Sequence, residues 1–302
     1  MINTNNKILK RIYKDRYYYY LLIPATAYFI IFHYIPIYGV KLAFEKYRIF
    51  GGNQWVGLAY FEELFTSPAF YKALMNTIII SGLKLLIGMP VPLILAILIN
   101  EVNNKYFKKY VQSVVYIPHF LSWVVIAGIF TMILSPVNGM VNEIIKAFGG
   151  TPVSFMTSTK HFRGVLVVSE LWRSAGWDSI LYTAALSNID PTLYEAAKID
   201  GANRWQRNIY ITLPELLKTM IVVFILNLGF FLNAGFDQVF NMMNDSVISV
   251  ADIIDIYAYR IGLLNMNYSY ATAVGLFKGV IGMILIITVN KIAKKNDAGG
   301  LY

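Results

Sequence analysis

The sequence predicts an all-α, polytopic integral membrane protein. Of its 302 residues, 57% are apolar and only 14% are charged. The mean hydropathy of +0.54 lies well above that of a soluble domain. Several apolar runs reach the roughly 20 residues that a helix needs to cross about 30 Å of hydrocarbon. Because there is no cysteine and the three histidines are scattered, neither a disulfide framework nor a metal site is expected.

Six apolar segments are long enough to be membrane spans. They occupy residues 18–44, 74–99, 112–134, 164–187, 216–234 and 271–290. The basic residues before the first segment suggest a signal peptide, but the apolar run is too long and no small-residue cleavage site follows it. Pro90 and Pro92 are expected to bend the second span, since each removes a backbone donor.

The distribution of lysine and arginine predicts the orientation of the spans, because cytoplasmic loops retain positive charge. If the chain starts inside, the inner segments (1–16, 100–111, 188–218, 291–302) hold fifteen of these residues and the longer outer segments (41–72, 135–163, 235–270) hold eight. Both termini are therefore expected in the cytoplasm. The predicted organisation is an N-terminal segment 1–17, a transmembrane domain 18–290 and a C-terminal tail 291–302. The basic residues are not interleaved with aromatics on one soluble face, so nucleic acid is not an expected partner.

The predicted inner loop at about 188–215 contains the polar stretch EAAKIDGANRWQRNIYITLP. Asp190-Pro191 is a favourable helix start, because Asp caps free amides and Pro at the first position loses no hydrogen bond. Gly201 offers a left-handed stop. A second short helix is expected to follow and to end near Pro214.

The spacing in this loop resembles the EAA motif of permeases from binding-protein-dependent ABC importers. Glu195-Ala196-Ala197 is followed after three residues by Gly201 and, nine residues later, by Ile211-Thr212-Leu213-Pro214. In that family the loop is a coupling helix that docks into a cytoplasmic ATPase. The resemblance assigns this role to Glu195, Ala196, Ala197, Asp200, Gly201, Ile211, Leu213 and Pro214.

A wider likeness covers nearly the whole chain and is to the carbohydrate, maltose-type branch. It is carried by the stretches at 19–44, 252–263 and 268–282. The resemblance implies import of an oligosaccharide across a bacterial cell membrane, with three partners besides the lipid bilayer and the sugar. These are a second permease, an ABC ATPase dimer and an extracellular binding protein. No cofactor is expected in this chain, because ATP would bind the ATPase.

Polar residues inside spans mark a possible transport path, since they are costly in hydrocarbon. The candidates from the fourth and fifth spans are Trp172, Arg173, Trp177, Asp178, Asn227 and Asn233. Glu170 and Arg173 are spaced to pair on one helix face. Charge neutralisation, interfacial anchoring and interhelical hydrogen bonding are alternative roles for these residues. Lys84 and Lys278 are expected to snorkel or to pair with a buried carboxylate.

The outer segment 235–270 is the better of two candidate surfaces for the binding protein. Its run 247–264 is patterned like an amphipathic helix, and in related permeases the segment before the last span reaches the binding protein or dips toward the path. The candidate contacts are Asp252, Asp255, Tyr259 and Arg260. A solvated acidic loop is the alternative.

Two other classes of protein are weighed against a permease. A polytopic enzyme would need a reactive group, and the chain has no thiol, HExxH, nucleophile elbow or P-loop. A secondary transporter is expected to show an internal repeat, and none is evident.

Overall fold

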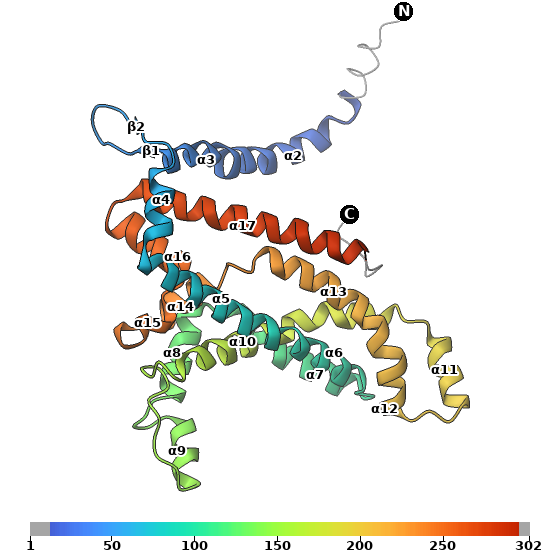
Figure 1. Cartoon of the computed structure of the whole chain (residues 1–302). Helices are drawn as coiled ribbons and strands as arrows, with labels where there is room; N and C mark the ends of the chain where they lie inside the picture. The colour runs from blue at the N-terminus through green and yellow to red at the C-terminus, as the bar shows by residue number, and fades with distance from the viewer. Residues whose placement is uncertain (1–12, 296–302) are drawn as a thin grey trace, which may run out of the picture.

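The computed structural model describes residues 13–295, and helices dominate it (Figure 1). Figure 1 shows the long helices running in broadly the same direction. These are α2 (Arg16–Phe29), α5 (Pro68–Gly88), α6 (Pro90–Asn100), α10 (Phe162–Ser187), α13 (Leu213–Gly229) and α17 (Tyr268–Lys295). Within the described range, β1 (Glu45–Lys46) pairs antiparallel with β2 (Gln54–Trp55). The predicted all-α fold is confirmed, while the ends of the predicted terminal segments, 1–12 and 296–302, lie outside the described residues.

Short helices connect the long ones. They are α3 (Ile35–Ile37), α4 (Ala59–Thr66), α7 (Lys105–Tyr116), α8 (Trp123–Ile133), α9 (Met140–Ala147), α11 (Pro191–Ile199), α12 (Arg204–Arg207), α14 (Phe236–Met242), α15 (Ile248–Ala251) and α16 (Ile254–Tyr259). In Figure 1, α11 and α12 lie at one end of the bundle, whereas α4, α9 and α14 to α16 lie toward the other.

Among residues 13–295, four helices are long and apolar enough to cross a membrane. They are Arg16–Phe44, Pro68–Asn100, Arg204–Gly229 and Tyr268–Ile292. Two further helices make a fifth span if they are taken together. They are Lys105–Phe120, which is α7 with the turn that follows it, and Trp123–Ile133, which is α8. The sequence predicted six, and the remaining one is α10. That helix has 26 residues, but Glu170, Arg173 and Asp178 interrupt its apolar sequence.

The predicted third span is not one straight helix. Its two parts, Lys105–Phe120 and Trp123–Ile133, meet at 105°. A short 3-10 turn that contains Pro118 ends the first part, and Leu121 is extended. Ser122 then caps the second part by accepting from the Val125 N–H at 3.4 Å. Hydropathy alone did not predict this break, because the sequence is apolar on both sides of it.

Proline acts differently in two other spans. In the second span one turn residue, Met89, separates α5 from α6 just before Pro90. Pro68–Asn100 is still one continuous span, and the bend expected from the prolines stays a prediction. The predicted end of a helix near Pro214 is wrong, because Arg204 to Gly229 is continuous. A π-helical segment, Asn208–Thr212, precedes this proline. Its wider turn accommodates the missing donor and the bulk of the ring, which would otherwise crowd the preceding turn.

The run 247–264 was predicted to be an amphipathic helix, but it is divided into α15, α16 and the π-helical segment Arg260–Leu264. Side chains from α5 hold the break between α15 and α16. Asn76 donates to the Asp252 carbonyl at 3.1 Å, and Thr77 Oγ1 accepts from the Ile254 N–H at 2.9 Å. These long-range contacts satisfy buried backbone groups that a continuous helix would have paired internally.

The predicted inner and outer segments lie at opposite ends of the bundle. Among the outer ones, Ser269 Oγ donates to the Glu45 carbonyl at 2.6 Å, and Asn244 donates to the Met156 carbonyl at 2.8 Å. At the other end, Asn208 reaches the side chain of Glu101. The grouping of the loops is that of the predicted topology, and which end faces the cytoplasm stays a prediction.

Candidate functional site

The coupling segment begins with a capped helix, α11. Asp190 Oδ1 accepts from the Thr192 N–H at 2.9 Å, and Pro191 occupies the first helical position. The backbone hydrogen bond from Thr192 lowers the pKa of the Asp190 carboxyl below its ordinary value. The predicted helix start is confirmed.

The end of α11 explains the spacing from alanine to glycine in the motif. The Ala202 N–H donates to the Ala197 carbonyl at 2.9 Å, and the Gly201 N–H donates to the Lys198 carbonyl at 3.2 Å. This pair of bonds is a Schellman motif, which needs a left-handed residue after the helix. Gly201 has a φ of +82°, so the predicted left-handed stop is confirmed.

The coupling segment presents its side chains to solvent. No residue of α11 is buried, and Glu195 and Gly201 are exposed. Four apolar side chains of the segment are also uncovered: Leu193 at 46%, Ile199 at 86%, Trp205 at 72% and Tyr210 at 76%. In Figure 1, α11 projects from the end of the bundle. Apolar groups that the rest of the described chain leaves uncovered are typical of a protein interface.

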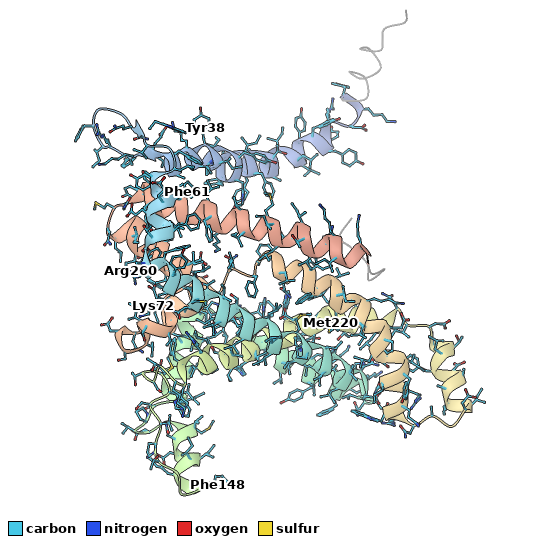
Figure 2. The ribbon with its side chains drawn as sticks, in the orientation of Figure 1. Tyr38, Phe61, Lys72, Phe148, Met220 and Arg260 are labelled. Carbon is cyan, nitrogen blue, oxygen red and sulfur yellow. The ribbon has the colours of Figure 1, made fainter. Side chains whose placement is uncertain are left out.

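The other end of the motif packs against the bundle. Leu213 borders an apolar cluster between α6, α10 and α13, and the side chain of Met220 lies beside it on α13 (Figure 2). The buried members of this cluster are Leu93, Ala96, Tyr182, Leu186 and Leu216. Pro214 is exposed, whereas Thr212 is buried. The motif therefore joins an exposed helix to the packed ends of three long helices.

A polar cavity of about 270 Å³ lies between α5, α10 and the end of α13. Five ionisable or amide side chains line it: Lys84, Glu170, Asp178, Asn227 and Asn233. The spacing of Glu170, Ser174 and Asp178 places them on one face of α10, because four residues make about one helical turn. Three of the six predicted path residues, Asp178, Asn227 and Asn233, therefore line one cavity.

Lys84 is the hub of this cavity. Its ammonium group donates to the Ala234 carbonyl at 2.7 Å and to the side chain of Gln238, and it lies 3.4 Å from the Glu170 carboxylate. The lysine thus ties α5 to α10 and to the connection between α13 and α14. Gly235, with a φ of +90°, brings this connection close, since a Cβ there would lie 2.9 Å from the lysine nitrogen. The prediction that Lys84 pairs with a buried carboxylate is confirmed.

The other three predicted path residues turn away from the cavity. Trp172 packs edge-on against Phe130, and Trp177 stacks on His119 with ring centroids 4.4 Å apart. Arg173 lies over the ring of Trp123 at 5.0 Å. The expected pairing of Glu170 with Arg173 is wrong, because the Glu170 carboxylate pairs with Lys84 on α5 while the Arg173 guanidinium lies over the Trp123 ring.

A second cavity, of about 480 Å³, lies between α13 and α17, and Phe230 and Asn233 border both cavities. Lys278 from α17 donates to the Asn233 side chain and contacts the Asp255 carboxylate at 2.5 Å. Asn233 lies beyond the end of α13 at Gly229, although the sequence placed it inside the fifth span. The predicted carboxylate partner of Lys278 is confirmed.

The four residues proposed to meet a binding protein have partners inside this chain. Asp252 is buried, and its carboxylate accepts from Arg260 Nη2 at 2.6 Å (Figure 2 labels Arg260). Asp255 contacts Lys278. Tyr259 packs on Phe236 and Phe240. These four side chains therefore do not form a solvated acidic loop, and their contact with a binding protein stays a prediction.

Several residues of these sites had no signal in the sequence. The Gln238 side chain accepts a hydrogen bond from the Lys84 ammonium group, although the two residues are 154 positions apart in the sequence. Glu101 follows the end of the second span and bonds to Asn208 in the coupling segment at 3.1 Å. A polar residue just beyond an apolar run is expected in any loop, so only the fold reveals these contacts.

A helical bundle with several apolar spans, an exposed helix α11 at one end and a polar cavity is an arrangement that fits a membrane permease. Residues 88–296 match the family described as binding-protein-dependent transport system inner membrane component. The chain belongs to this family, and it is a permease subunit of an ABC importer, as the EAA motif predicted.

Relatives and solved structures agree with this assignment. In Bacillus subtilis (strain 168), the polygalacturonan/rhamnogalacturonan transport system permease protein YteP is 41% identical over 98% of this chain and 93% of its own length. Protein LplB of the same organism is 44% identical over 96% and 92%. A chain from the crystal structure of a bacterial ABC transporter for the acidic polysaccharide alginate is 39% identical. It has a TM-score of 0.88 and covers 96% of this chain and 99% of its own.

Proposed function

We propose that this subunit forms, with a second permease, the path for an oligosaccharide that an extracellular binding protein delivers. Support for a carbohydrate comes from the named substrates of the relative YteP and of the alginate importer. Both point to fragments of an acidic polysaccharide. A related importer has been solved with an alginate pentasaccharide-bound periplasmic protein, which supports a binding protein as the partner.

ATP hydrolysis belongs to a separate cytoplasmic ATPase dimer in this proposal. The observation that carries it is the exposed, capped helix α11, whose apolar side chains are uncovered while Thr212 at its base is buried. Closure of the ATPase would move α11 and bias the bundle between inward-open and outward-open arrangements. With α11 in the cytoplasm, both termini are cytoplasmic as well.

The substrate would pass the cavity lined by Asp178, Asn227 and Asn233. Amide side chains next to the aromatic surfaces of Phe230 and Phe231 suit a hydroxyl-rich ligand. Lys84 and Lys278 add ammonium groups on the two sides of Phe230 and Asn233. The path residues and the binding-protein contacts are both part of the proposal.

Replacement of Gly201 by Asp tests the coupling role. No other atom lies within 4 Å of a Cβ built at Gly201, so the change meets no clash inside the chain. We expect the importer to assemble while uptake is lost, because the new side chain blocks the ATPase groove and strains a left-handed residue.

Gly149 provides the matched control. It has a φ of +79°, it also has open space around its Cβ position, and it lies in the predicted outer segment. Gly149→Asp introduces the same backbone strain away from α11, so it should keep the coupling of ATP hydrolysis to uptake. Normal uptake by an assembled Gly201→Asp importer would contradict the coupling role.

A further inference from the structure

A chain of polar contacts connects the coupling helix to the end of the second span. Tyr194 on α11 lies 2.9 Å from the Thr212 hydroxyl, which lies 3.2 Å from Asn208 Oδ1. Asn208 Nδ2 then donates to Glu101 Oε1 at 3.1 Å. The Thr212 hydroxyl can donate to Asn208 Oδ1 or to the Arg207 carbonyl at 3.5 Å, and in both cases it can accept from the Tyr194 hydroxyl. Every step has a donor and an acceptor.

Local helix geometry brings these groups into line. Arg204, Asn208 and Thr212 follow one another at intervals of four residues, so they share one face of the helix. That face meets Glu101, which is the C-terminal cap residue of α6. The Arg204 guanidinium is 3.8 Å from the other carboxylate oxygen, and its side chain is 66% exposed. An exposed pair at this distance contributes little. The hydrogen bond from Asn208 is therefore the effective link.

The position of Glu101 gives this link a mechanical consequence. Glu101 ends α6, and α6 meets α5 at Met89, just before Pro90. Lys84, the hub of the polar cavity, lies on α5 one turn before that residue. A displacement of α11 that reaches Glu101 thus acts on α6, which continues the span whose α5 part lines the cavity.

We propose that Glu101 is a positioning residue that transmits the movement of the coupling helix to the second span through Asn208. The proposal rests on the coupling role proposed for α11. Glu101 touches neither substrate nor ATPase in this account. It acts by holding α6 to the helix that continues the coupling segment, alongside the apolar cluster at the same end.

The test is the ratio of oligosaccharide uptake to ATP hydrolysis for the complete importer in proteoliposomes. Glu101→Ala should lower this ratio roughly three- to tenfold, the factor that corresponds to one net hydrogen bond. Glu101→Gln keeps an oxygen acceptor for Asn208 and should stay near the wild-type ratio. Asn208→Ala should match Glu101→Ala, and the double variant should be no worse than either, because both remove the same contact.

Glu215→Ala is the matched control. Glu215 lies on α13 near the same end, and it pairs with Lys218 on its own helix at 3.0 Å. This variant should leave the ratio unchanged. A normal ratio for Glu101→Ala, or an equal loss for Glu101→Gln, would overturn the proposal. If Glu101→Ala fails to assemble, the comparison of Glu101→Gln with Asn208→Ala decides in the same way.

Gly201→Asp, measured in parallel, separates the two proposals. Loss of coupling in Gly201→Asp together with a normal ratio in Glu101→Ala and Asn208→Ala would reject Glu101 alone. Normal coupling in Gly201→Asp would reject the role of α11 itself.

Discussion

Removal of the Lys84 charge should destabilise the bundle, because it leaves the Glu170 carboxylate without a counter-ion. Lys84→Met keeps the length and the apolar stem of the side chain but removes the ammonium group. Glu170 then loses its cation at 3.4 Å, and the Ala234 carbonyl loses a donor at 2.7 Å. A buried carboxylate without a counter-ion is more costly than the pair was favourable.

The magnitude follows from the burial of the two partners. Breaking a fully buried pair costs about 3–5 kcal/mol. The Lys84 side chain is 12% exposed and that of Glu170 is 28% exposed, so the carboxylate regains part of its hydration. We therefore expect a loss of about 2–3 kcal/mol in the free energy of unfolding. Glu170→Gln in the same chain should restore part of this loss, because it removes the unpaired charge.

The assay is thermal unfolding of the purified importer in detergent for both single variants and the double variant. The double variant should lose less stability than the two single losses added together, because the two groups are in contact. Lys146→Met is the control, because Lys146 pairs with Glu143 on an exposed surface with side chains 39% and 56% exposed. It should change stability by about 1 kcal/mol or less. Additive losses for Lys84 and Glu170 would refute the coupling between them.

Three further predictions concern the path, the helix cap and the topology. Asn227→Ala and Asn233→Ala should lower uptake and substrate-stimulated ATP hydrolysis while the complex still assembles. Wild-type uptake in both would remove these residues from the path. Asp190→Ala should speed amide hydrogen exchange in the first turn of α11, and Asp190→Asn should not, since Asn also caps. Because the pKa of Asp190 is lowered, the wild-type cap persists above the ordinary Asp pKa of about 3.9 and is lost only as the pH falls through the lowered value. Equal exchange in both variants would count against the cap. A cysteine introduced at Ser246 should react with an impermeant reagent in intact cells, whereas one at Asn203 should react only after the membrane is opened. The reverse pattern would overturn the topology.

Features that depend on neighbouring residues were predictable from the sequence. The Asp190-Pro191 start and the Gly201 stop depend on backbone groups within a few residues, and the structure confirms both. The single turn residue before Pro90 in the second span follows from the same local chemistry. Proline alone was an incomplete guide, since a π-helical segment carries the helix through Pro214.

Contacts between distant segments were not predictable. The sequence placed Lys84 inside a span and predicted a carboxylate partner, but Glu170 was expected to pair with Arg173. The partner of Glu170 depends on which helices pack on α10, and α5 brings the Lys84 ammonium group to it. Single-sequence periodicity carries no information about that packing. For the same reason, half of the predicted path residues line the cavity, and the others contact α8 and the 3-10 turn Ile117–Phe120 before it.

The most direct test of the account is the ATP dependence of transport by the reconstituted importer. Proteoliposomes would contain this subunit, its partner permease and the ATPase, with the loaded binding protein outside and labelled oligosaccharide as the substrate. We expect accumulation that requires hydrolysable ATP on the side of α11 and that Gly201→Asp abolishes. Equal accumulation without ATP, or with a non-hydrolysable analogue, would contradict the assignment of this chain to an ATP-driven path.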